Sequence, residues 1–247
     1  NAVLLSEDMN ANAVQIADLL KDFEQQYPVH KDAFETVARV RLVTLQKAGR
    51  FGELEKNVDY IYANYEGEKR LELLKALDQV LVRDIKNLKK QNDTDNLQAA
   101  KRTLARLYSD KIERNDFAKD ESQGKFKYEL AQLYLDVKDY DHAAALYTQL
   151  QDGAYSLVSL AGLARIAEVQ GDKKKALGYW EEMLQDSQVG DPIWFRGSYE
   201  VAVLNVSLGD AQAGCRTARG TRAMINRLGD QGLKKKIQDF VTENCGV

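Results

Sequence analysis

Residues 163–180 read LARIAEVQGDKKKALGYW, and this stretch indicates the fold of the chain. Ala164 lies seven positions before the turn Gly171-Asp172, and Ala176 lies five positions after its glycine. A small residue on each helix lets two backbones approach closely, while Tyr179 and Trp180 fill the space beside them. The glycine suits a helix C-terminus and the aspartate suits the N-cap of the next helix. The stretch therefore predicts two antiparallel helices joined by a tight turn.

The same spacing recurs in two further segments of the chain. One segment contains the turn Lys138-Asp139, and the other contains the turn Gly209-Asp210. Each turn has a small residue seven positions before its first member and another five positions after it. These small residues are Ala131 and Ala143 in the first segment, and Ala202 and Gly214 in the second. Three helix pairs are therefore expected in tandem.

Three such pairs resemble the tetratricopeptide repeat family, whose repeat is a helix-turn-helix of about 34 residues. Ala143 and Ala176 are 33 residues apart, whereas Ala176 and Gly214 are 38 apart, and the extra residues fall around the loop at 190–192. The resemblance covers about residues 122–228. It departs from the family pattern at Gly214, where Ala is usual, and in the missing or displaced proline after the second helix. It implies an all-α fold, a right-handed α-solenoid of antiparallel helix pairs.

The N-terminal half carries a weaker form of the same signal. Leu42 and Leu45 precede the turn at 48–51, and an apolar helical pattern follows, so we interpret this part as a degenerate repeat. A first helix is expected to end near Tyr27-Pro28, and a longer one to span 68–90. Its apolar stripe is formed by Leu71, Leu74, Leu77, Leu81, Ile85 and Leu88. The polar stretch 113–123 then predicts a junction between a degenerate helical region, 1–117, and tetratricopeptide-like repeats with a C-terminal capping helix, 118–247.

Composition excludes several classes of function. The 247 residues are 44% hydrophobic and 30% charged, which excludes a disordered chain, and they contain only 2 prolines and 16 glycines, as expected for helices. The formal net charge of −3 provides no broad basic field for nucleic acid. No apolar run approaches the roughly 18 residues of a membrane-spanning helix, so no membrane insertion is expected.

Catalytic and metal-binding patterns are not found in the sequence. The two histidines, His30 and His142, are not at metal-ligand spacing, and both are expected to have structural or solvent-exposed roles. The glycine in Gly67-Glu68-Lys69 lacks the neighbouring glycines and the preceding strand of a phosphate-binding loop. We therefore predict no catalytic residue, no metal and no cofactor.

The resemblance also implies where a partner binds. In such a solenoid the first helix of each pair lines the concave surface. Glu129 occupies one of the places where Asn is needed to clamp a C-terminal dicarboxylate, so binding of a chaperone tail is not expected. Ordinary solvated helix surface is the alternative for each groove residue. The predicted protein-binding groove consists of Lys125, Tyr128, Gln132, Arg165, Glu168, Arg196 and Tyr199.

The two cysteines are expected to form a disulfide. Helices from Asp210 to about Leu228 and from about Gln231 to Asn244 should fold back as a hairpin centred near residue 230. Cys215 and Cys245 are equally distant from that centre, so their sulfurs should lie at the same height. The bond would indicate an extracytoplasmic protein, periplasmic or membrane-anchored, whereas two free thiols would indicate a cytoplasmic one.

These patterns leave three functions open. The first is a non-catalytic scaffold that presents its groove to a peptide or protein of unknown identity. The second is a soluble structural subunit of a cell-envelope complex, anchored through a segment before residue 1, since the chain begins with Asn rather than Met. The third is an enzyme or its regulatory domain. Homo-oligomerisation is left open.

Overall fold

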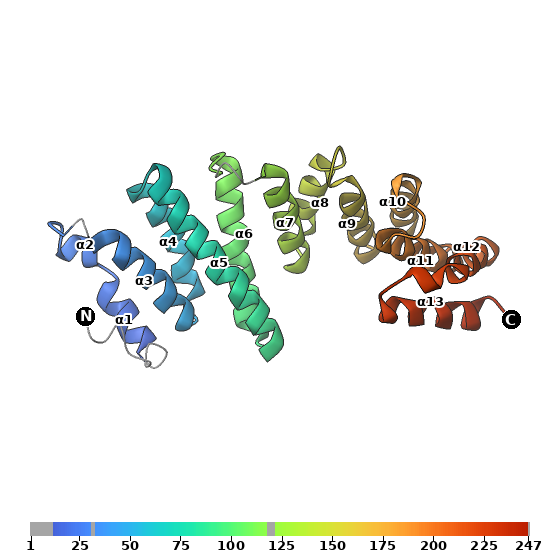
Figure 1. Cartoon of the computed structure of the whole chain (residues 1–247), viewed down its shortest axis with the longest axis horizontal. Coiled ribbons are helices and arrows are strands. Elements are labelled where there is room, and N and C mark those ends of the chain that lie inside the picture. Colours follow the sequence, from blue (N-terminus) through green and yellow to red (C-terminus); the bar gives the residue numbers. More distant parts are fainter. Residues whose placement is uncertain (1–11, 31–32, 118–121, 247) are drawn as a thin grey trace. The chain divides into compact units, whose positions relative to one another are not determined.

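The structure is a computed structural model that describes residues 12–30, 33–117 and 122–246 (Figure 1). The described residues are 80% helical and contain no β-strand. They divide into two compact units, Asn1–Phe126 and Lys127–Val247. The predicted all-α solenoid is therefore confirmed as a fold class. The predicted boundary between residues 117 and 118 precedes 118–121, which lie outside the described residues, and it stays a prediction.

The first unit is built around one long helix whose leucines are buried. Leu74, Leu77 and Leu81, three members of the predicted stripe, have no exposed surface, and neither has the adjacent Leu73. This long helix packs against the helices before and after it in the sequence. The helices of this unit are α1 (Ala13–Leu20), α2 (Phe23–Gln26), α3 (Phe34–Lys47), α4 (Phe51–Asn64), α5 (Gly67–Gln91), α6 (Thr94–Glu113) and the start of α7 (Gln123–Asp136).

The predicted first helix is shorter than expected. It was predicted to reach Tyr27-Pro28, but α1 ends at Leu20 and the short α2 follows. The buried side chain of Arg41 donates a hydrogen bond from Nη2 to the carbonyl oxygen of Leu20, at 2.8 Å. A side-chain donor thus satisfies a carbonyl at the helix end that would otherwise lack a partner.

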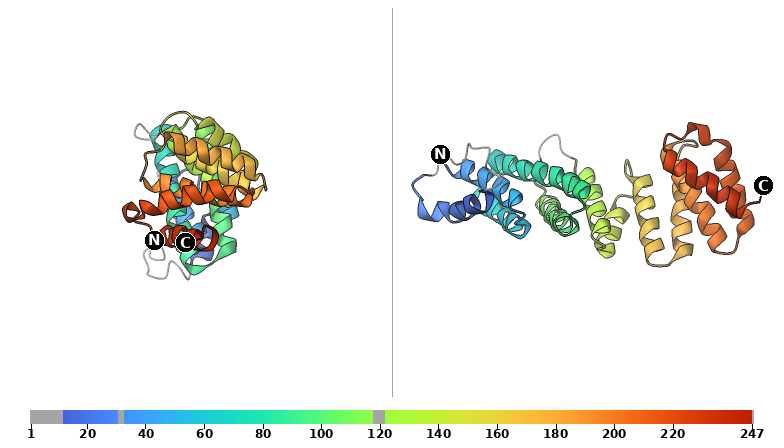
Figure 2. Two further views of the ribbon diagram at one scale, coloured as in Figure 1. Left: turned by 90° about the vertical axis from the view of Figure 1, so that its right-hand side faces the viewer. Right: turned by 90° about the horizontal axis from the view of Figure 1, so that it is seen from below.

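The second unit consists of helices that pack against their neighbours in sequence, drawn from yellow-green to red in Figure 2. Its turns match the prediction. Gly171 and Gly209 have φ values of +82° and +97°, and Asp172 and Asp210 accept hydrogen bonds from the backbone of the helices that they precede. The helices of this unit are the remainder of α7, α8 (Tyr140–Gln149), α9 (Ser156–Val169), α10 (Lys173–Asp186), α11 (Pro192–Ser207), α12 (Ala211–Ala223), the 3-10 helix η4 (Ile225–Arg227) and α13 (Gln231–Asn244).

The small residues of the repeats are buried where helices cross. Five alanines at the repeat positions have no exposed surface, and Trp180 and Tyr147 are buried beside them. The helix predicted to run from Asp210 to about Leu228 instead ends at Ala223, and η4 follows. This change of helix type lets Ile225 and Leu228 join the same core as α13. The five alanines are Ala131, Ala143, Ala164, Ala176 and Ala202.

Gly214 departs from the family's alanine because α11 and α12 approach too closely at this point. A Cβ atom built on Gly214 would lie 2.7 Å from the carbonyl oxygen of Ala202 and 2.6 Å from Cγ2 of Val206. The first of these atoms belongs to the backbone, so it moves only if the helix moves. Gly214 therefore permits the contact between the two helices.

We expect Gly214→Ala to lower the free energy of unfolding by about 1–3 kcal/mol, the usual cost of overpacking. Gly220 is a matched control in the same helix, because a Cβ atom there meets nothing within 4 Å. Gly220→Ala should raise the stability by about 0.5–1 kcal/mol through better helix propensity. Urea denaturation of the two variants measures both values. Changes of the same sign would contradict the close approach of α11 and α12.

Candidate binding surfaces

The predicted groove residues of the second unit lie on the first helix of each pair. Tyr128 and Gln132 belong to α7, Arg165 and Glu168 to α9, and Arg196 and Tyr199 to α11. The seventh residue, Lys125, belongs to the first unit. Its position relative to the other six stays a prediction.

Tyr128 is at the centre of an aromatic cluster at one end of this face. Its ring stacks on that of Tyr155 with a centroid distance of 5.5 Å, and it lies 6.5 Å from the ring of Tyr147. Gln132 donates a hydrogen bond from Nε2 to the Tyr128 hydroxyl oxygen. Burial raises the pKa of Tyr128, while the positive charge of nearby Arg165 opposes that rise. Tyr128 therefore provides a half-buried ring with a polar edge.

Glu168 is held in place by a buried tryptophan of the following helix. Trp180 Nε1 donates a hydrogen bond to Glu168 Oε1 at 2.6 Å, and the indole is only 1% exposed. The sequence identified each residue separately, one as a groove residue and the other as a packing residue. Their contact fixes the carboxylate at the surface between α9 and α10.

Charges from three helices meet beside Glu168. Glu200 of α11 is largely buried, which raises the pKa of its carboxyl group, and the negative charge of Glu168 raises it further. Arg196, Lys236 and Arg165 act in the opposite direction, and Arg196 Nη1 lies 3.6 Å from Glu200 Oε1. Oppositely charged groups of α9, α11 and α13 therefore share one patch of surface.

The sequence prediction missed Glu200 and Lys236 of this patch, and it also missed the contact of Phe240 on α13 with Tyr199. The Tyr199 ring meets the Phe240 ring edge-on at 6.1 Å, and Lys236 acts on Glu200. Glu200 could have been found, because it lies four positions after Arg196 on the same helix. Phe240 and Lys236 carry no such local signal, because the packing of α13 alone brings them to α11.

The two cysteines lie where the hairpin geometry places them. Their Sγ atoms are 2.15 Å apart and their Cα atoms 5.3 Å apart, which is a disulfide geometry. Arg219 of α12 also donates hydrogen bonds to the carbonyl oxygens of Cys245 and Gly246. The end of α13 is thus joined to α12 by a covalent bond and by a charged side chain.

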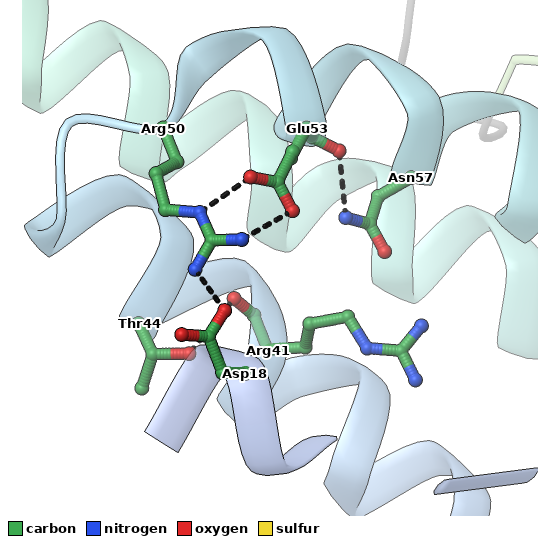
Figure 3. Close-up of polar contacts among 6 residues, drawn as sticks. All are labelled: Asp18, Arg41, Thr44, Arg50, Glu53 and Asn57. Atoms are coloured by element: carbon green, nitrogen blue, oxygen red, sulfur yellow. Dashed lines mark hydrogen bonds and ion pairs between the residues drawn. The ribbon is translucent and has the colours of Figure 1, made fainter. Parts of the chain in front are cut away.

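A separate cavity of about 450 Å³ in the first unit lies among α1, α3 and α4. Figure 3 shows the Arg50 guanidinium between two carboxylates, with Nη2 2.8 Å from Glu53 Oε2 and Nη1 2.6 Å from Asp18 Oδ1. These acidic groups neutralise Arg50, so this network joins α1 to α4. The two lysines that line this cavity, Lys21 and Lys56, are exposed at its rim.

Potential metal ligands do not cluster in the described residues. These residues contain no group of three or more His, Cys, Asp or Glu side chains that could hold a metal ion. The ring of His142 lies 2.8 Å from the carboxylate of Asp139, which caps the same helix, and both groups are at the surface. Within the described ranges, no helix is long and apolar enough to cross a membrane.

Of the comparisons with known proteins, only the one with solved structures found similar chains. No family model and no curated protein matches the chain. A putative kinesin light chain from Podosopora anserina with nearly identical TPR-like repeats has 15% identity and a TM-score of 0.48, over 89% of this chain and 97% of that one. A point variant of that protein has 15% identity and a TM-score of 0.49, over 89% of this chain and 96% of the variant. A circular tandem repeat protein has 15% identity and a TM-score of 0.28, over 94% of this chain and 59% of that one.

Proposed function

We propose that this protein is a non-catalytic helical-repeat scaffold that binds a protein or peptide through one face of its second unit. This face, called the α7–α13 face below, belongs to no single helix. Helices α7, α9 and α11 provide the predicted groove residues, and α13 extends the surface beside α11. The residues of the face are Tyr128, Gln132, Tyr155, Arg165, Glu168, Arg196, Tyr199, Glu200, Lys236 and Phe240.

The charged patch around Glu200 is the observation that carries this proposal. Burial and the neighbouring Glu168 both disfavour the ionised form of Glu200, while Arg196, Lys236 and Arg165 favour it, so acidic and basic groups of three helices share this patch. Half-buried aromatic rings at 128 and 199 flank these charges. Fixed charges beside aromatic side chains are typical of surfaces that bind protein partners, where tyrosine and arginine are enriched.

The proposal is tested by reversing positive charges on the α7–α13 face. The double variant Arg165→Glu, Arg196→Glu is compared with the control Arg216→Glu, Arg222→Glu, which makes the same charge change on exposed positions of α12. Partners are cross-linked and recovered with the full chain from the native source and quantified by mass spectrometry. We expect the first variant to lose about tenfold of the specific partner signal and the control to retain it. Equal recovery of partner proteins with both variants would contradict binding through the α7–α13 face.

A second candidate function is favoured by the cysteine pair. Disulfides persist in oxidising compartments, so the bond supports an extracytoplasmic protein, either periplasmic or anchored at a membrane, over the cytoplasmic alternative. In that setting the chain would act as a structural subunit of a cell-envelope complex. Fractionation of the native cell distinguishes an extracytoplasmic from a cytoplasmic location. A cytoplasmic protein with reduced thiols would contradict this second function.

A further inference from the structure

Asp84 occupies a position of α5 that the helical pattern assigns to the core. It lies three positions after Leu81 and four before Leu88, in line with the buried leucines of the same helix. Its residue surface is only 5% exposed. A carboxyl group in such a place costs free energy unless a partner compensates its charge or its hydrogen bonds.

Asp84 lines a cavity of about 250 Å³ within the first unit. The lining comes from the end of α3, the start of α4, α5 and the start of α6. Gln46 faces the cavity from α3, Asn96 from α6, and Asn87 and Gln91 from the same helix as Asp84. The last two residues are exposed, so they form the entrance, while Asp84 lies at the inner end.

The inner wall of this cavity is rich in hydrogen-bond acceptors. Asp84 Oδ2 and Gln46 Oε1 are both buried, and neither has a hydrogen-bond partner among the described residues. Asn96 directs both its backbone N–H and its Nδ2 donor to Asp93, so its Oδ1 is left as an acceptor beside Gly49. The C-terminal end of α3 adds the negative end of a helix dipole.

Asp84 is the acidic group of this wall. Burial raises the pKa of Asp84, and the positive charge of Arg83 and a hydrogen bond from Gln46 act against that rise. The described residues give Asp84 no ion pair within 4.0 Å. A ligand that suits this wall therefore carries positive charge and N–H donors together.

The volume of the cavity and the number of possible metal ligands limit the kind of ligand further. Drug-sized ligands use pockets of about 300–1,000 Å³, so a cavity of about 250 Å³ has room for one head group. A divalent metal usually needs several carboxylate, histidine or thiolate ligands, and the described residues provide no such group. Rotation about χ2 of Asp84 exchanges its two carboxylate oxygens, so either can meet a donor in the cavity.

We propose that this cavity binds the guanidinium or ammonium group of a basic side chain from a partner protein. The chemistry of the cavity defines the head group, and its source in a protein rests on the proposed scaffold function. The site is distinct from the α7–α13 face, because it belongs to the first unit. A basic side chain inserted here would form charge-assisted hydrogen bonds with Asp84 and Gln46.

The test follows the ¹³Cγ resonance of Asp84 in the full chain, labelled with [¹³C]aspartate. Ethylguanidinium and ethylammonium chloride are titrated at constant chloride concentration, with tetramethylammonium chloride as a cation that has no N–H donors. We expect saturable shifts with the first two salts and none with the third. Asp84→Asn, followed through the side-chain amide of Gln46, should weaken binding by about 10- to 100-fold. Asp141→Asn, an exposed change of the same kind in the second unit, should leave binding unchanged.

Three results would overturn the inference. The first is an Asp84 resonance of a protonated carboxyl group at pH 7 that no salt shifts, because the proton would then satisfy the site. The second is binding that emerges only in Lys47→Gln, which would show that Lys47 at the rim fills the cavity. The third is binding of ethylguanidinium without binding of the peptide acetyl-Gly-Arg-Gly-amide, which would contradict a protein source. None of these results depends on the α7–α13 face, so the proposed function of that face is tested separately.

Discussion

Replacement of Trp180 by alanine should lower the free energy of unfolding by about 3–5 kcal/mol, the usual cost of removing a buried aromatic side chain. The indole is 1% exposed and packs in one core with Ala164, Ala176 and Met183. Its removal leaves a cavity between α9, α10 and α11, because the two alanines beside it are too small to fill the space. Urea or thermal denaturation of the purified chain measures the loss.

Two further variants separate packing from hydrogen bonding at this position. Trp180→Phe retains most of the buried ring but removes the donor of the 2.6 Å hydrogen bond to Glu168, so we expect a smaller loss of about 1–3 kcal/mol. Val169→Ala changes a side chain that is 60% exposed and should cost less than about 0.5 kcal/mol. If Trp180→Ala is as mild as Val169→Ala, the described core of the second unit is wrong.

Removal of the disulfide should lower the free energy of unfolding by about 3–4 kcal/mol. The bond closes a loop with a sequence separation of 30, and the chain-entropy model gives this value for a loop of about that length. The loss should also be local, because the bond joins the end of α13 to α12. We therefore expect hydrogen exchange in α13 to accelerate more than in α9.

The measurement compares the native chain with Cys215→Ala, Cys245→Ala, each with and without a reducing agent. Reduction should destabilise the native chain to about the level of the double variant and have no effect on that variant. Thiol labelling of the protein from its native source provides the independent control. Two reactive thiols there would contradict both the bond and the proposed extracytoplasmic location.

The sequence alone determined the helix pairs of the second unit and several of their details. Ala131, Ala164 and Ala202 recur before turns that contain a residue of positive φ and a capping aspartate, and this pattern depends only on neighbours along the chain. The pairing of Cys215 with Cys245 followed from the same local geometry, because the height of a residue in a helical hairpin depends on its distance from the turn.

Only the tertiary structure decided the contacts between helices distant in sequence. Gly214 was a departure from a family pattern until the carbonyl of Ala202 showed that a methyl group does not fit there. The sequence carried no functional signal at Asp84, which lies beside an apolar stripe, whereas the end of α3 and the start of α6 form a cavity next to it. The packing of α13 brought Phe240 to Tyr199. The physical reason is that periodicity and turn chemistry fix which face of a helix is buried, whereas the closeness and angle of packing fix what that face meets.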